Sequence, residues 1–368
     1  MDEYTTLQVI WFILISVLWI GYFVLEGFDF GVGILMKLIG RNEPEKRAIL
    51  HSIGPVWDGN EVWLLVAGGA TFAAFPEWYA TLFSGFYIAL LVILVALIVR
   101  NVAFEFWGKG STEAWRNRWE WGIAIGSLVP ALLWGVAWAN IIAGVPIDAE
   151  AEYTGTFFTL LNPYALLGGL ATLSIFFAHG ALFLELRTEG EIRERARSVA
   201  VRATIAAAAI SAVFLAWTLA EQSPLDVGSA ICAVLAVIGL LAAIFYARQS
   251  PGRAFGGTCA AIAFFFIALF IDLFPNTMVS STSPDFDMTL NFSSSSDYTL
   301  TVMTVVAVLL VPVVLLYQGW TYWVFRRRLS AEDFGDVRTP LDLLDQRKKE
   351  VGDGPGPGPG TGRESSGP

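Results

Sequence analysis

The sequence is poor in the side chains that hold haem iron and metal ions. Its 368 residues include 2 His, 2 Cys and 5 Met, the residue types that supply most imidazole, thiolate and thioether ligands. Cys232 and Cys259 are predicted near opposite ends of two different helices, which excludes a disulfide or a shared metal between them. An integral haem or metal site in this chain would therefore have very few possible ligands, and if the chain belongs to a redox enzyme, we expect most of the redox centres to lie in a partner.

The two histidines differ in their predicted surroundings. His51 falls at the entrance of a helix and is interpreted as a surface residue. His179, between Ala178 and Gly180, falls deeper in an apolar run. A buried histidine is either a satisfied structural residue or an axial ligand or proton relay. The sequence leaves both interpretations open.

Charged residues are also scarce, at 15% of the chain against 55% hydrophobic residues. Soluble domains carry about 25% charged residues, so this composition excludes a soluble globular protein. Apolar runs of about 20 residues, the length a helix needs to cross a bilayer, recur from Leu7 to Phe325. Motifs of phosphate loops, dinucleotide sites and nucleophile elbows are missing, and we expect no nucleic-acid partner. The predicted fold class is an all-α polytopic membrane protein.

Polar breaks divide the apolar sequence into nine predicted membrane spans. All 23 Lys and Arg residues fall in the odd-numbered loops, with their flanking helix ends, and in the C-terminal tail. By the positive-inside rule, the N-terminus is predicted outside and the C-terminus in the cytoplasm. The spans cover about 8–36, 52–75, 79–106, 119–143, 164–186, 202–221, 227–247, 254–274 and 299–325.

The C-terminal segment is predicted to lie outside the membrane. We expect a transmembrane domain over residues 1–330 and a cytoplasmic tail over residues 331–368. From Gly352 the tail repeats Gly-Pro and ends in Ser-Ser-Gly-Pro, a composition that cannot bury a core. The tail is therefore predicted to be disordered from about residue 352.

Four carboxylates fall inside the first two predicted spans. Glu26 and Asp29 are three residues apart, as are Asp58 and Glu61, so each pair is expected to share one helical face. A charge inside a span is costly unless it is paired or hydrated, and each such residue is therefore a functional candidate. Because the two spans are antiparallel neighbours, we expect the four acids to cluster in the cytoplasmic half of the membrane.

This predicted cluster has a functional and a structural interpretation. Glu105, near the inner end of the third span beside Arg100, is expected to extend it towards the cytoplasm. Closely spaced carboxylates have coupled proton equilibria, which favours a proton pathway. Alternatively, the acids cap helix ends or bond to the backbone near the glycines. Gly27 and Gly31 have the Gly-x-x-x-Gly spacing of close helix packing.

Six short motifs occur in order along the chain, and they resemble those of one known family, subunit II of the cytochrome bd-type quinol oxidases of bacterial respiratory chains. The resemblance runs from about Tyr4 to Phe325, and its Trp-Asp-Gly-Asn element is specific. The motifs are Gly27-Phe28-Asp29-Phe30-Gly31-Val32-Gly33, Trp57-Asp58-Gly59-Asn60-Glu61-Val62-Trp63, Ala67-Gly68-Gly69-Ala70-Thr71-Phe72-Ala73-Ala74-Phe75-Pro76, Phe83-Ser84-Gly85-Phe86-Tyr87, Leu161-Asn162-Pro163, and Leu300-Thr301-Val302-Met303-Thr304 before Val311-Pro312.

The resemblance implies a fold, a partner and a reaction. It implies nine transmembrane helices, as two four-helix bundles plus a peripheral helix, with a first bundle over about 8–143 and a second part over about 164–325. The implied partner is subunit I, which carries two haems b, one haem d and the quinol site. In the bacterial cytoplasmic membrane, such a complex oxidises quinol and reduces O2 to water with cytoplasmic protons. The scarcity of His agrees with a haem-free or haem-poor subunit.

The resemblance also assigns roles to residues. Asp58 and Glu105 match positions of the family's proposed proton path, and Asp29 matches a family motif. Glu26 falls where the family is expected to have an acid. With Arg100, these residues form the predicted proton-pathway set.

Two tryptophans and one acid complete the candidates. Trp63 matches a residue near the proposed O2 route of some family members. Trp57 and Trp63 either pack in the core or face a planar cofactor of the partner. At Glu61 the family commonly has an amide, so the role of this acid stays open.

The leading hypothesis is a subunit that stabilises the haem-bearing subunit I and delivers protons to the O2-reducing site. A stand-alone proton-coupled transporter would also use buried acids, but it would need an inverted repeat or broken helices, which the sequence does not show. A structural scaffold whose acids do not titrate is the third hypothesis. The choice between ubiquinol and menaquinol, a bound structural quinone or lipid, and small single-helix accessory subunits stay open.

Overall fold

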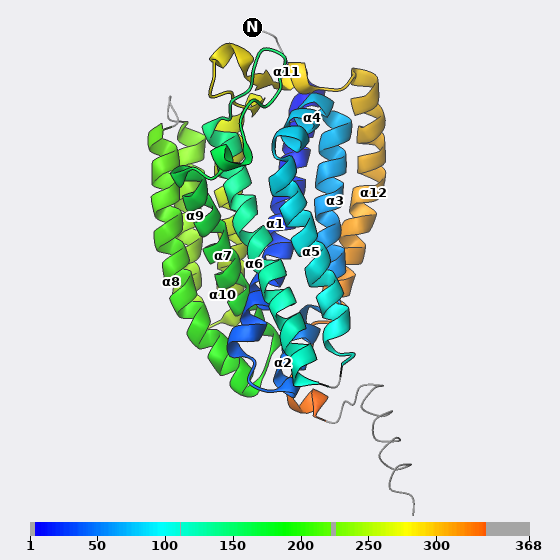
Figure 1. Cartoon of the computed structure of the whole chain (residues 1–368), viewed down its shortest axis with the longest axis vertical. Coiled ribbons are helices and arrows are strands. Elements are labelled where there is room, and N and C mark those ends of the chain that lie inside the picture. The colour runs from blue at the N-terminus through cyan, green and yellow to red at the C-terminus, as the bar shows by residue number, and fades with distance from the viewer. Residues whose placement is uncertain (1–3, 111, 222–225, 336–368) are drawn as a thin grey trace, which may run out of the picture.

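The chain forms a bundle of long helices, seen in a computed structural model that describes residues 4–110, 112–221 and 226–335. Figure 1 shows the long helices side by side along one axis, with short elements at both ends. The predicted disorder from about residue 352 lies outside the described residues. The α-helices are α1 (Thr6–Ile39), α2 (Glu43–Ile53), α3 (Trp57–Ala74), α4 (Pro76–Gly85), α5 (Tyr87–Trp107), α6 (Glu113–Ala143), α7 (Pro163–Arg187), α8 (Gly190–Glu221), α9 (Val227–Tyr246), α10 (Pro251–Leu273), α11 (Leu290–Ser293) and α12 (Asp297–Val324).

Eight helices in the described part of the chain are long and apolar enough to cross a membrane. The predicted all-α polytopic class is therefore confirmed. The predicted span 52–75 corresponds to α3, which is not among the eight, since its 18 residues begin with a turn that includes Asp58, Asn60 and Glu61. Nevertheless α3 runs beside α5 and α12 along the bundle (Figure 1).

One predicted span and one predicted loop differ from the structure. The predicted span 79–106 is divided at Phe86 into α4 and α5, and the adjacent Gly85 has no room for a side chain, since a Cβ there would lie 2.7 Å from Tyr153. The first predicted loop contains the helix α2, which begins where the Asn42 side chain accepts a hydrogen bond from the Glu45 N–H. An Asn cap followed by a first-turn proline favours helix initiation.

Short elements cover the end of the bundle that contains the N-terminus. The strands β1 (Asn276–Met278) and β2 (Met288–Thr289) pair antiparallel. The 3-10 helices are η1 (Phe157–Leu160), η2 (Pro284–Phe286) and, at the other end, η3 (Glu332–Phe334). The outer segments therefore form an ordered cover over the helix ends.

Helix α1 lies in the middle of the bundle and packs against α3, α6, α7 and α10. Its aromatic side chains interlock with those of its neighbours, as in the stacked rings of Phe23 and Phe266, whose centroids are 4.1 Å apart. Such pairs contribute about 0.5–1.5 kcal/mol beyond their burial. Helix α12 lies at the edge, where it buries Leu300 alone.

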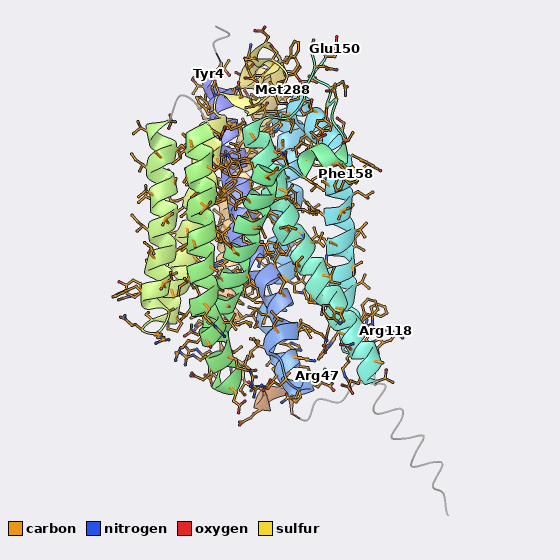
Figure 2. All side chains as sticks on the ribbon, turned by 60° about the vertical axis from the view of Figure 1, so that its left-hand side comes forward. Tyr4, Arg47, Arg118, Glu150, Phe158 and Met288 are labelled. Carbon is orange, nitrogen blue, oxygen red and sulfur yellow. The ribbon has the colours of Figure 1, made fainter. Side chains whose placement is uncertain are left out.

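Basic residues gather at one end of the bundle. Figure 2 places Arg47 and Arg118 at one end, and Tyr4, Glu150 and Met288 at the other. We call the first the basic end. This arrangement agrees with the segregation of basic residues in the sequence.

Ion pairs join the elements at the basic end. Glu120 of α6 bonds both Lys37 of α1, at 2.8 Å, and Lys46 of α2, at 2.7 Å. Arg195 of α8 pairs with Glu45 of α2 at 2.5 Å. Burial raises the pKa of the Glu45 carboxyl, but the hydrogen bonds from Arg195 and the Arg41 N–H outweigh it and hold the pKa below its ordinary value. Helix α2 is thereby fastened to α6 and α8, and the same Glu120 also ties α6 to α1.

The glycines of the predicted packing motif lie where α1 touches α7. A Cβ on Gly27 would lie 2.6 Å from the Phe176 ring, and one on Gly31 would lie 2.2 Å from the Phe176 carbonyl oxygen. On the facing helix, a Cβ on Gly180 would lie 2.5 Å from the Gly31 Cα. The close-packing interpretation of Gly27 and Gly31 is confirmed.

We expect Gly180→Ala to lower the free energy of unfolding by about 1–3 kcal/mol, the usual cost of overpacking. The added methyl group meets backbone atoms of Gly31, which cannot rotate away. Thermal unfolding of the purified protein in detergent measures the change. Gly256→Ala is the matched control, because no heavy atom lies within 4 Å of its Cβ position. An equal loss in both variants would contradict the packing argument.

Candidate functional site

A fully buried arginine, Arg100 of α5, lies at the centre of a polar cluster inside the bundle. Its guanidinium donates to the buried carboxylate of Glu26 on α1 and lies 3.6 Å from that of Glu61 on α3. It also lies over the Phe30 ring, 4.9 Å from the centroid. A charge in a low-dielectric interior is tolerated when it is paired, and two carboxylates and an aromatic face supply the pairing here.

The second half of the cluster is centred on Asn60 of α3. Its amide nitrogen donates to Asp29 Oδ2 at 2.7 Å. Its carbonyl oxygen accepts hydrogen bonds from Gln318 Nε2 at 3.0 Å and from the Tyr322 hydroxyl at 2.7 Å, both on α12. The Trp63 indole nitrogen donates to Gln318 Oε1 at 3.2 Å. One amide therefore links α1, α3 and α12.

Several atoms in this cluster are buried without a hydrogen-bond partner among the described residues. They are Glu26 Oε2, Asp29 Oδ1, and Arg100 Nε and Nη1. Such atoms lose their hydration on burial and gain most from an added proton, water or polar neighbour. The cluster therefore combines paired charges with free positions for hydrogen bonding.

The structure brings together most of the predicted acids, but not all. Glu26, Asp29 and Glu61 meet around Arg100 and Asn60. Asp58 is exposed and lies away from them. The predicted four-acid cluster is wrong for Asp58 because Asn60, two residues on and thus about 200° around the helix, faces inward instead.

Glu105 lies near the basic end of α5. Asn101 lies one turn before it, on the same side of the helix. Asn101 Nδ2 donates to Glu61 Oε2 at 2.7 Å. The Glu105 side chain is 69% exposed and lies 3.9 Å from Lys109. Helix α5 thus carries a line of polar groups from the buried cluster to the basic end.

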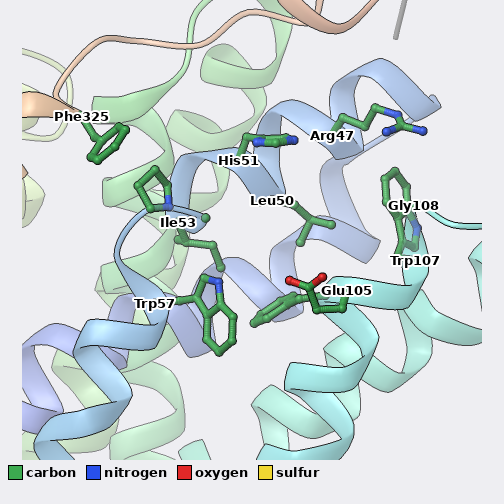
Figure 3. A pocket seen from close by; sticks show the side chains of 12 residues that line it. Arg47, Leu50, His51, Ile53, Trp57, Glu105, Trp107, Gly108 and Phe325 are labelled. Carbon is green, nitrogen blue, oxygen red and sulfur yellow. The ribbon is translucent and has the colours of Figure 1, made fainter. Parts of the chain in front are cut away.

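Glu105 lines a cavity of about 460 Å³ between α2, α3 and α5. Figure 3 shows its carboxylate directed towards the space between Trp57 and Trp107, with His51 and Arg47 beyond. Burial and the nearby Arg47 hold the pKa of His51 below its ordinary value. The cavity is therefore lined by a carboxylate, an uncharged imidazole at neutral pH and aromatic rings.

His179 has both ring nitrogens in hydrogen bonds. Nδ1 lies 2.6 Å from the Thr258 hydroxyl and Nε2 lies 3.1 Å from the Val24 carbonyl oxygen. The ring stacks on Phe255 at a centroid distance of 4.4 Å. This geometry favours the structural interpretation of His179 over the ligand interpretation.

In the described ranges, no group of three or more His, Cys, Asp or Glu side chains is arranged to hold a metal ion.

The two candidate tryptophans both pack against neighbouring helices. Trp63 packs its ring against Gly21 of α1, where a Cβ would lie 2.3 Å away. Trp57 packs against Phe104 at 5.2 Å between ring centroids. Both tryptophans are thus partly enclosed by the chain itself.

The sequence did not single out four members of the cluster: Asn60, Asn101, Gln318 and Tyr322. Asn60 carried a signal, since it stands in the Trp-Asp-Gly-Asn motif. Gln318 also did, because an amide in the middle of an apolar span requires a buried partner. For Asn101 and Tyr322, the signal appears only once the helices are packed.

Comparison with known proteins gives one consistent family. The family described as cytochrome bd terminal oxidase subunit II matches residues 7–325. Cytochrome bd ubiquinol oxidase subunit 2 of Bacillus subtilis is 42% identical over 89% of this chain and 98% of its own length. Cytochrome bd-I ubiquinol oxidase subunit 2 of Escherichia coli is 39% identical, over 90% of this chain and 98% of its own length.

A solved structure shows the same fold. A chain in the structure of bd oxidase from Geobacillus thermodenitrificans superposes with a TM-score of 0.70 and 18% sequence identity. The superposition covers 87% of this chain and 99% of that one.

We expect Arg100→Met to lower the free energy of unfolding by about 3–5 kcal/mol, because it leaves the buried Glu26 carboxylate without its counter-charge. Thermal unfolding in detergent measures the loss. The control is Arg118→Met, since Arg118 is exposed and has no ion pair in the described part of the chain.

The double variant Glu26→Gln/Arg100→Met tests the cause of this loss. It removes both charges and should recover at least about half of the lost stability, as neutral replacement of a buried pair is far less costly than breaking it. A double variant no more stable than Arg100→Met alone would show that pairing is not the reason.

Proposed function

The chain belongs to the cytochrome bd terminal oxidase subunit II family, and from this premise we propose that it is the haem-free or haem-poor subunit of a quinol:O2 oxidoreductase. It acts with subunit I, which carries the two haems b, the haem d and the quinol site. Its own tasks are to stabilise subunit I and to conduct cytoplasmic protons towards the O2-reducing site. The observation that carries these tasks is the buried Arg100 cluster with its polar line to the basic end.

The proposed membrane topology has nine spans. Helix α3 is the additional one, and its inward polar side chains are satisfied by α1, α5 and α12 instead of lipid. The spans form two four-helix bundles, over about 8–143 and 164–325, plus a peripheral helix. The basic end faces the cytoplasm and the N-terminus lies outside, which the positive-inside rule supports.

Protons enter the proposed pathway at the cavity of the basic end. Glu105 is exposed there and can exchange protons with water. Asn101, one turn deeper on α5, connects this region to Glu61 through its amide. Glu61 in turn lies beside Arg100, next to Glu26. These contacts support a relay from the surface to the cluster.

Asp58 is the proposed point of contact with the partner. It is exposed on the face of α3 opposite Asn60, and the Cβ position of its neighbour Gly59 has no heavy atom within 4 Å. A carboxylate on the outside of a membrane span is costly next to lipid. A partner subunit that covers this face, and accepts the proton there, accounts for both observations.

Two further roles are proposed from the family resemblance. Trp63, fixed by Gly21 and Gln318, lies along the O2 route, and Trp57 faces the haem-bearing partner. A structural quinone or a lipid chain occupies an apolar groove of about 470 Å³ between α3 and α6, lined by Leu64, Phe83 and Leu94 among others. Its almost wholly apolar lining supports a long hydrocarbon ligand.

Copurification distinguishes the oxidase subunit from a stand-alone transporter. We expect the chain, isolated in mild detergent, to retain a haem-bearing subunit at near-equal stoichiometry, with absorption bands of haems b and d. The physical reason is the outward face of α3, which bears a charge that lipid does not accommodate. Isolation as a haem-free single chain that transports a solute would contradict the proposal.

Asp58→Asn distinguishes proton delivery from a scaffold role. Positioned acid–base groups contribute about 10²–10⁴-fold to proton-transfer steps, so we expect quinol oxidation with O2 to slow by at least about tenfold. The haem spectrum should persist, because Asp58 is exposed and its side chain makes no ion pair or hydrogen bond in the described part of the chain. Glu77→Gln, an exposed acid on α4 at the other end, is the control. Unchanged turnover in Asp58→Asn would remove this residue from the pathway.

A further inference from the structure

The segment that follows α12 is fixed against the end of α7. The Leu329 N–H donates to the Arg187 carbonyl at 2.9 Å, and the Glu189 N–H donates to the Leu329 carbonyl at 2.9 Å. The Arg328 side chain donates from Nε to the Leu186 carbonyl at 3.1 Å. These bonds hold three arginines, Arg187, Arg326 and Arg328, around one space.

That space is a cavity of about 380 Å³ at the basic end, distinct from the cavity of Glu105. The three arginines line it together with Phe183, Phe255 and Tyr322, and no acidic side chain is among its lining residues. One part of the wall is therefore strongly cationic and the rest is aromatic or aliphatic.

None of the three arginines has a carboxylate within 4 Å among residues 4–110, 112–221 and 226–335, and all three line the same cavity. Arg195, Arg197 and Arg327 at the same end are each paired, Arg327 with Asp333 at 3.1 Å. Within the described ranges, the interactions of Arg326 are with the ring and the carbonyl of Trp323, three residues earlier. Part of the hydrogen-bonding capacity of each guanidinium is left for an anion from outside the chain.

We propose that this cavity binds a phosphate group on an amphipathic ligand, namely the headgroup of an anionic phospholipid. Guanidinium groups bind phosphate oxygens in a forked geometry with charge-assisted hydrogen bonds. Basic pockets between membrane helices at the cytoplasmic side suit anionic headgroups. The aromatic wall accommodates the glycerol and acyl part. Free phosphate shares the anionic chemistry but gains nothing from this wall.

The test uses the purified complex in nanodiscs of phosphatidylcholine with or without phosphatidylglycerol. Native mass spectrometry is expected to show one phosphatidylglycerol retained per chain. Arg187→Gln/Arg328→Gln removes two charge-assisted donors and should bind it at least about tenfold more weakly. Arg327→Gln, which removes a paired arginine, should bind it normally. Equal retention in wild type and the double variant, or equal retention of both lipids by wild type, would overturn the proposal.

Two further arms separate the sources of phosphate and guard against misfolding. Inorganic phosphate added to phosphatidylcholine nanodiscs should leave the melting temperature of the wild-type complex unchanged, whereas phosphatidylglycerol should raise it. Stabilisation by inorganic phosphate alone would assign the site to a free anion and overturn the lipid. Arg187→Lys keeps the charge but not the fork, so we expect intermediate lipid retention. Full retention in Arg187→Lys combined with loss in Arg327→Gln would also overturn the assignment.

Discussion

The pairing of Arg100 with Glu26 and Glu61 is the constraint on which the rest of the structure depends. A fully buried guanidinium cannot be left unpaired, so the helices that carry its counter-charges, α1 and α3, have to lie against α5. This requirement fixes the depth at which three helices meet. It also explains why a helix as polar at its start as α3 lies within the bundle, because its polar groups find their partners in protein.

Asn60 extends this constraint to the edge of the bundle. It takes a hydrogen bond from each of two residues of α12 and gives one to Asp29. Helix α12 buries little apolar surface, and its other hydrogen bonds to α1 and α3 come from the indoles of Trp11 and Trp63. Since hydrogen bonds between membrane helices are directional, an amide at this position specifies where a weakly packed helix attaches.

The sequence predicted the fold class and the positions of most long helices, because apolar runs of membrane length and one-sided basic residues are strong signals. It did not predict the break at Phe86 or the helix α2, which depend on close contact with Tyr153 and on local capping. Helical spacing correctly joined Glu26 with Asp29. It misplaced Asp58, since spacing fixes which residues share a face but not which face turns inward, and Asn60 decides that here.

The distribution of paired and unpaired arginines shows where the chain is complete in itself. On α2 and α8, Lys46, Arg195 and Arg197 find carboxylates within the chain, so these three cations need no charge from outside. Around the end of α12, three arginines face a cavity that no acidic side chain lines. On α3 the reverse holds, with an outward carboxylate that no described cation meets. Unpaired charges of opposite sign, on α3 and after α12, therefore mark two separate surfaces at which other molecules contribute to this structure.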